Sequence, residues 1–170
     1  MNMRKIMLLG EIGVGKSSLV RRLVHDHFEE GYLATIGVDI VKYALRGAGP
    51  DGKLDLDLIV WDTDGNFGDS IFRHSYIKGA AAALIVGDAT RKMTLEAMPR
   101  LARGFEETLP GRHCAFILNK IDLVPYPASQ VLPEALGSGR WPLVRTSAKT
   151  GQHVKEAIVD VAATIIRRGL

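Results

Sequence analysis

The feature that most constrains this sequence is the octapeptide GEIGVGKS at residues 10–17. It follows the pattern G-x-x-x-x-G-K-S, directly after an apolar run at residues 5–9 and directly before helical periodicity at residues 17–27. Glycines at these spacings let successive backbone N–H groups turn inward around an anion, and the start of a helix adds a partial positive charge. The unit therefore predicts a nucleoside triphosphate site, with Lys16 reaching the β- and γ-phosphates and the Ser17 hydroxyl available to Mg²⁺.

Strands and helices are expected to alternate along the chain. Apolar or β-rich runs predict strands at residues 5–9, 39–45, 54–61, 82–86, 115–118 and 143–144. Helical spacing predicts helices at residues 17–27, 70–78, 95–108 and 153–167, with a shorter one near 129–136. A turn rich in glycine at residues 47–52 predicts a hairpin, and Asp55 and Asp57 alternate with leucines as on a strand with one solvated face. The pattern predicts an α/β fold of three layers, with helices on both faces of a mostly parallel six-stranded sheet.

Composition favours one soluble domain over residues 1–170. Of the 170 residues, 46% are hydrophobic and 24% are charged, which is ordinary for a globular domain. The longest apolar run, residues 80–86, is far shorter than the roughly 20 residues that span a bilayer, and the N-terminus does not resemble a signal peptide. The one cysteine, Cys114, excludes an internal disulfide and is expected to be a buried small side chain of a cytoplasmic protein.

The charge distribution gives little indication of nucleic acid or lipid as a partner. The net charge is +3, and the basic residues occur as scattered pairs with few aromatic residues between them, so no nucleic acid is expected. The sequence ends without the cysteine that prenylation needs, and Met1-Asn2 does not fit N-myristoylation. We therefore expect no direct lipid anchor on this chain. Any membrane attachment would come through a partner or a segment outside this sequence.

Polar segments that follow three other predicted strands indicate which metal and which nucleotide base the chain binds. Asp62 ends the third strand and is the candidate carboxylate for Mg²⁺, through water. Asn119-Lys120-Ile121-Asp122 follows the fifth strand, at the edge where open α/β sheets bind ligands. The Asp122 carboxylate can accept two parallel hydrogen bonds from N1–H and the 2-amino group of guanine, a donor pair that adenine lacks. Residues 146–149, Thr-Ser-Ala-Lys, follow the last strand and can offer a backbone N–H to guanine O6.

In their order and spacing, these segments resemble the guanine-nucleotide motifs of the Ras superfamily, over essentially the whole chain. The motifs are the phosphate loop, Thr35, Asp62-Thr63-Asp64-Gly65, Asn119-Lys120-x-Asp122 and Ser147-Ala148-Lys149. Residues 32–39 and Trp61-Asp62-Thr63 are most similar to the Rab branch. The resemblance implies a Mg²⁺-dependent switch that binds GTP or GDP, hydrolyses GTP to GDP slowly, and changes conformation near residues 28–38 and 62–78.

The resemblance also implies a role for each matching residue. Thr35 would join Ser17 and Asp62 at Mg²⁺ and sense the γ-phosphate, to which Gly65 would donate its N–H. Phe28 would pack against guanine, Lys120 would lie along the base, and Tyr32 would close over the phosphates. The implied catalytic residues are Asn66, Gly65, Lys16 and Thr35. The implied nucleotide-binding residues are Gly13, Val14, Gly15, Lys16, Ser17, Ser18, Phe28, Tyr32, Thr35, Gly65, Asn119, Lys120, Asp122, Ser147, Ala148 and Lys149.

Protein partners are implied by the same resemblance. Effectors, exchange proteins and activating proteins would bind through the two switch regions. Trp61 and Tyr76 occupy positions that form an effector-facing hydrophobic cluster in Rab proteins, but Ile40 replaces the usual phenylalanine of that cluster.

Three residues near the expected γ-phosphate depart from the family pattern. The glutamine that orients the attacking water is Asn66 here, one methylene shorter, and a displacement of about 1 Å can cost roughly 100-fold in rate. Asp64 replaces a small apolar residue, and its carboxylate would either repel the phosphate or help to orient water. The branched side chain of Ile12 would crowd an arginine from an activating protein. We expect slow hydrolysis with weak or unconventional activation.

Two alternatives stay open at this point. The same three departures also suit a GTP-bound scaffold with negligible turnover, and the chain would also fit a Roc-type GTPase domain of a larger protein. A kinase or ATPase with the same phosphate loop is disfavoured by Asn119-Lys120-x-Asp122 and by the lack of an arginine-rich lid segment.

Overall fold

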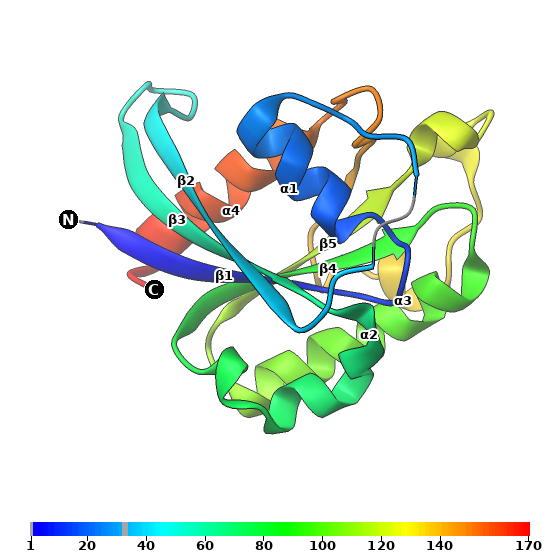
Figure 1. The fold of residues 1–170 in the computed structure, drawn as a ribbon, viewed down its shortest axis with the longest axis horizontal. Helices are drawn as coiled ribbons and strands as arrows, with labels where there is room; N and C mark the ends of the chain where they lie inside the picture. Colours follow the sequence, from blue (N-terminus) through cyan, green and yellow to red (C-terminus); the bar gives the residue numbers. More distant parts are fainter. Residues whose placement is uncertain (1, 32–33) are drawn as a thin grey trace.

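Six strands form one sheet in the order β2-β3-β1-β4-β5-β6 in the computed structural model, which describes residues 2–31 and 34–170 (Figure 1). The strands are β1 (Met3–Leu9), β2 (Val38–Ala48), β3 (Leu54–Thr63), β4 (Ala80–Asp88), β5 (His113–Asn119) and β6 (Leu143–Arg145). Only β2 runs antiparallel to its neighbour among the described pairs, as the expected hairpin with β3 requires. The predicted α/β fold with a mostly parallel six-stranded sheet is confirmed.

Helices cover both faces of this sheet and divide the core in two. On one face lie α1 (Lys16–His25) and α4 (Val154–Arg168), and on the other lie α2 (Lys92–Thr108) and the short α3 (Glu134–Gly137) (Figure 1). Because β4 is covered on both sides, all nine of its residues are buried, which explains its apolar sequence over residues 80–86. Each fully buried aliphatic side chain contributes about 1.5–3 kcal/mol to folding.

Two predicted helices differ from the structure. In place of a helix at residues 70–78 the chain forms two 3-10 segments, Gly65–Arg73 and Ser75–Ile77. Gly68, with φ of 46°, and the extended His74 between the segments interrupt the helical backbone. The helix expected near residues 129–136 is reduced to α3, which begins directly after Pro133, and the 3-10 turn Pro127–Ser129 lies before it.

The solvated face predicted for the third strand is also wrong at one position. Asp57 is only 3% exposed, because Lys42 and Arg46 of β2 lie over its carboxylate, with Lys42 Nζ 2.7 Å from Oδ2. Hydrogen bonds from Lys42 and then Arg46 hold the pKa of Asp57 below its usual value.

The parallel strands place their carboxyl ends at one edge of the sheet. β1, β3, β4 and β5 end there at Leu9, Thr63, Asp88 and Asn119. The chain termini meet at the opposite side, where the Arg4 side chain bonds the Leu170 carbonyl (Figure 1). Within the described residues, none of the helices has the length and apolar character that crossing a membrane requires.

Candidate nucleotide-binding site

A pocket of about 440 Å³ opens at this carboxyl edge. It collects segments that lie far apart in the sequence: the phosphate loop, residues 28–31, Thr35, residues 63–65, and the loops after β5 and β6. Predicted site residues that line it are Gly13, Gly15, Lys16, Ser17, Ser18, Phe28, Thr35, Gly65, Asn119, Lys120, Asp122, Ala148 and Lys149. The predicted residues Val14, Asp62, Asn66 and Ser147 are not among its walls, and Tyr32 lies outside the described residues.

The phosphate loop has the geometry of an anion cradle. Gly15 precedes α1 with φ of 100°, and a side chain there would collide with the amide of Asn119, so this position requires glycine. Lys16 is 6% exposed and its Nζ donates to the carbonyls of Gly10 at 2.8 Å and Glu11 at 2.9 Å. Burial lowers the pKa of Lys16 to about 8, against the opposing effect of nearby carboxylates. The loop therefore encloses a lysine whose positive charge phosphate oxygens would stabilise.

Three oxygen groups meet beside the start of α1. Ser17 Oγ lies 2.7 Å from Thr35 Oγ1 and donates to Asp62 Oδ2. Asp62 Oδ1 is buried and has no hydrogen-bond partner in the part of the chain that the structure describes, and burial, the largest effect, raises the pKa of the Asp62 carboxyl. Two hydroxyls and an unpaired carboxylate oxygen fit Mg²⁺, which prefers oxygen ligands, better than zinc. The described residues hold no group of three or more His, Cys, Asp or Glu side chains suited to a metal.

The Asn119 side chain links the loops expected to bind the base to the phosphate loop. Its Nδ2 donates to the Val14 carbonyl at 3.0 Å, and its Oδ1 accepts from Thr146 Oγ1 at 3.1 Å and Ala148 N at 3.2 Å. The residue is 1% exposed, so a loss of these bonds would leave buried polar groups unpaired. Asn119 therefore connects three loops of the pocket through its side chain.

Lys120 and Asp122 belong to the same loop and both line the pocket. Lys120 Nζ donates to the Gly13 carbonyl at 2.6 Å and to Asp88 Oδ2 at 2.7 Å. Asp122 lines the pocket and accepts from Ser147 Oγ at 2.6 Å, so Ser147 lies behind Asp122. This contact leaves the second carboxylate oxygen of Asp122 available to a ligand.

Asp88 is a residue that the sequence analysis missed. It ends β4 with 1% exposure and pairs with Lys120. Burial would raise the pKa of Asp88, but hydrogen bonds from Lys120 and Thr90 outweigh it and hold that pKa below its usual value. A carboxylate at the end of the strand beside β5 is the signal that would have identified it, since β4 and β5 pair in register with Asp88 opposite Asn119.

The second predicted switch lies against the phosphate loop. A Cβ atom added to Gly65 would lie 2.5 Å from the backbone N of Ile12, so only glycine permits this approach. Asn66 is exposed, and its side-chain Nδ2 donates to Asp64 Oδ1 at 2.9 Å. The side chain of Asn66, the group expected to orient water, is therefore hydrogen-bonded to the Asp64 carboxylate.

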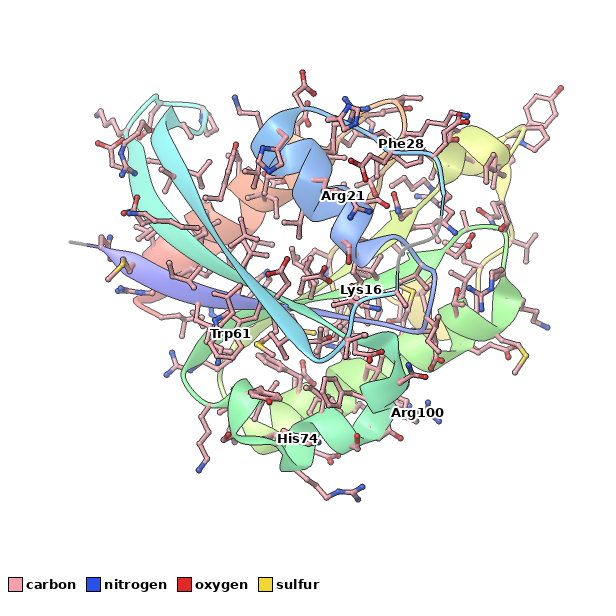
Figure 2. The ribbon with its side chains drawn as sticks, viewed as in Figure 1. Lys16, Arg21, Phe28, Trp61, His74 and Arg100 are labelled. Carbon is pink, nitrogen blue, oxygen red and sulfur yellow. The ribbon has the colours of Figure 1, made fainter. Side chains whose placement is uncertain are left out.

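Basic residues around the pocket were also missed. Arg21 lines it, with an Nε that is buried and has no hydrogen-bond partner among the described residues. Arg22 donates to the carbonyls of Ala148 at 2.8 Å and Lys149 at 2.5 Å. Arg100 of α2 reaches Asp69 at 3.2 Å and Glu11 at 3.8 Å. Figure 2 labels Lys16 and Arg21 along α1 and Arg100 on α2.

An aromatic cluster lies at the second predicted switch segment. Ring centroids of Trp61 and Tyr76 are 6.2 Å apart, and His74 stacks on Tyr76 at 5.6 Å. Ile40 is 52% exposed and is the register partner of Trp61 across β2 and β3. Figure 2 labels Trp61 and His74 near the segment before β4. Sequence reasoning identified Trp61 and Tyr76 but not His74.

A phosphate loop between a strand and a helix, a parallel sheet and a pocket at the carboxyl edge define an α/β nucleotide-binding protein of the P-loop class. The family model described as "Ras family" matches residues 5–167. The chain is 33% identical over 172 aligned positions to Ras-related protein RIC1 of Oryza sativa subsp. japonica, covering 96% of this chain and 81% of that protein. It is 31% identical over 170 positions to Ras-related protein RABD2a of Arabidopsis thaliana, covering 96% of this chain and 80% of that protein.

A third relative has similar identity and coverage. GTP-binding protein yptV2 of Volvox carteri is 30% identical over 171 positions, with coverage of 96% of this chain and 76% of that protein. The chain belongs to the Ras family of small GTPases, and its relatives fit the expected Rab-like branch.

Proposed function

We propose that residues 1–170 form one guanine-nucleotide switch domain that binds GTP or GDP with Mg²⁺ and hydrolyses GTP slowly. The proposal is supported by one pocket in which the loop after β5, expected to select guanine, is bonded to the phosphate loop. Lys120 Nζ donates to the Gly13 carbonyl and Asn119 Nδ2 donates to the Val14 carbonyl. Membership of the Ras family, whose members are GTPases, supports the same activity.

Each set of residues in the pocket would contact a different part of the nucleotide. Lys16 would hold the β- and γ-phosphates, and Asp122 would select guanine by its paired donors. Ser17, Thr35 and Asp62 would hold Mg²⁺, which when bound neutralises phosphate charge. Phe28 would cover the base, and Gly65 would offer its N–H to the γ-phosphate.

Partners would bind where the nucleotide changes the surface. The two expected switch segments contribute residues 28–31, Thr35 and residues 63–65 to the pocket walls, and the second segment carries His74 and Tyr76 of the aromatic cluster. Ile36 is 92% exposed and Ile40 is 52% exposed beside them. We therefore place effectors and regulators on this side of the molecule.

A second candidate function is a GTP-bound scaffold with negligible turnover. The hydrogen bond from the Asn66 amide to Asp64 favours it, because an amide held there does not orient water in the pocket.

A single-turnover measurement separates the two functions. The purified chain is loaded with GTP and Mg²⁺, freed of excess nucleotide, and the bound nucleotide is chromatographed over several hours. Conversion to GDP supports a slow switch, and persistent GTP supports the scaffold.

Replacing Asp122 tests the choice of guanine. Asp122→Asn should weaken GTP binding by about 100-fold or more and improve binding of xanthosine triphosphate, since the substituted amide presents a donor where the carboxylate accepted. The matched control is Asp51→Asn in the turn between β2 and β3, which should leave both affinities unchanged. Unaltered GTP affinity in Asp122→Asn would refute guanine selection by this residue.

A further inference from the structure

Asp64 makes two hydrogen bonds to the residue expected to orient water. Its Oδ1 accepts from the backbone N of Asn66 at 2.8 Å and from Asn66 Nδ2 at 2.9 Å. Asp64 lines the pocket, whereas Asn66 does not and is exposed. The Asn66 amide is thus bonded to the pocket wall rather than facing the space where the phosphates would lie.

The backbone around Asp64 is fixed by the two sides of the pocket. Its backbone N donates to the Gly37 carbonyl at 2.8 Å, which links it to the first switch segment. Gly65, the next residue, is packed against the backbone of Glu11 and Ile12 with no room for a Cβ atom. These contacts hold the Asp64 carboxylate at the pocket edge and keep its acceptor oxygen within reach of Asn66.

The hydrogen bond between Asn66 and Asp64 restricts what the Asn66 amide can bind. A side-chain amide orients water with both its donor and its acceptor, and a hydrogen bond to a carboxylate is about twice as strong as one to a neutral group. Asn66 reaches about 1 Å less far than glutamine would, so it has less freedom to make a second contact while bonded to Asp64.

We propose that Asp64 is a positioning residue that keeps the Asn66 amide out of the pocket and thereby sets the slow rate of GTP hydrolysis. The inference rests on the proposed GTPase function. It attributes slow turnover to a hydrogen bond within the second switch and not only to the length of the Asn66 side chain.

Three variants test the proposal by single-turnover GTP hydrolysis. Asp64→Ala should raise the rate by about tenfold, because it frees the amide. Asp64→Asn keeps an acceptor oxygen and removes the charge, so its increase should be much smaller. The gain of Asp64→Ala should disappear in the double variant Asp64→Ala/Asn66→Ala. Asp160→Ala, on the exposed side of α4, controls for loss of a surface carboxylate.

A structural readout accompanies the rates. In protein bound to a non-hydrolysable GTP analogue, the NMR signals of the Asn66 side-chain NH₂ group should shift in Asp64→Ala and shift less in Asp64→Asn. A role of Asp64 confined to general stability would not move these signals differently in the two variants. Circular dichroism confirms that each variant is folded.

Other results would overturn the proposal. An unchanged or slower rate in Asp64→Ala would show that Asp64 does not restrain Asn66. Equal gains in Asp64→Ala and Asp64→Asn would assign the effect to charge alone, and a gain that survives Asn66→Ala would assign it to another residue. If all variants bind GTP and none hydrolyses it, this inference fails while nucleotide binding stands. Failure to bind GTP would instead refute the proposed function.

Discussion

Two buried carboxylates, Asp57 and Asp88, are paired with cations from other segments of the chain. Asp57 is covered by two cations of the neighbouring strand, and Asp88 is paired with Lys120 of the next loop. Breaking such a pair by removing one partner is costly, since the remaining buried charge loses its compensation. His113 differs, because the basic residues near it are of like charge to its protonated form.

His113 should make the free energy of unfolding depend on pH. Burial, followed by the charges of Arg168 and Arg167, lowers the pKa of this imidazole from 6.5. As the pH falls below 6.5 the unfolded chain takes up a proton that the folded chain refuses, so the folded state loses stability. Urea unfolding with excess GDP and Mg²⁺ should show a larger loss between pH 7.5 and 5.5 for the wild type than for His113→Gln. Equal losses would contradict this assignment.

At the scale of elements, the second switch segment packs on α2. A Cβ atom at Gly104 of α2 would lie 2.8 Å from Cδ2 and 2.9 Å from Cζ of Phe72, which belongs to the 3-10 segment Gly65–Arg73. Arg100, one turn earlier on α2, pairs with Asp69 of the same segment. A glycine within a helix weakens it, so close packing of Phe72 gives Gly104 a structural purpose.

Replacing Gly104 should separate helix propensity from packing. In a Phe72→Ala background, Gly104→Ala should stabilise the protein by about 0.5–1 kcal/mol, because alanine favours the helix. In the wild-type background the added methyl group displaces the Phe72 ring, so the same change should be neutral or destabilise by up to about 2 kcal/mol. Chemical denaturation of the wild type, the two single variants and the double variant gives both changes in unfolding free energy. The same stabilisation in both backgrounds would show that Phe72 does not depend on this glycine.

At the scale of the whole molecule, the two segments proposed to sense the nucleotide occupy one edge of the sheet and the hairpin turn lies at the other. Ser17 bonds Asp62 and lies within hydrogen-bond distance of Thr35, and Asp64 bonds Gly37, so the two switch segments are joined to the phosphate loop and to each other. A ligand that adds contacts there should order both segments together, since it can shift the conformation only through differential contacts.

Hydrogen exchange should map this response. Backbone amides in residues 28–38 and 62–78 should exchange about tenfold more slowly with a non-hydrolysable GTP analogue than with GDP, both in Mg²⁺. Residues 47–53, at the opposite edge, serve as an internal control and should exchange equally in the two states. Equal exchange in the switch segments would contradict a nucleotide-dependent switch and favour a constitutive scaffold.

The sequence by itself determined the features that depend on local spacing. The phosphate loop, the alternation of strands and helices and the polar residues after β3 and β5 could be predicted, because each needs only neighbours in the chain. Since parallel strands end at one edge, the same reasoning predicted that Lys16, Asn119 and Asp122 would lie near one another, and the resemblance to the Ras superfamily added Thr35. All four line one pocket in the structure.

Only the tertiary structure decided features that depend on partners distant in sequence or on the geometry of a single turn. The pairing of Asp88 with Lys120 needs two strands in register, and the burial of Asp57 needs cations from β2. The hydrogen bond between Asn66 and Asp64 needs the local 3-10 turn that Gly65 forms against the phosphate loop. Residues 70–78 have helical periodicity, yet packing against α2 and the backbone at Gly68 and His74 favour two short 3-10 segments. Contacts with α2, a helix distant in sequence, outweigh the local helical propensity there.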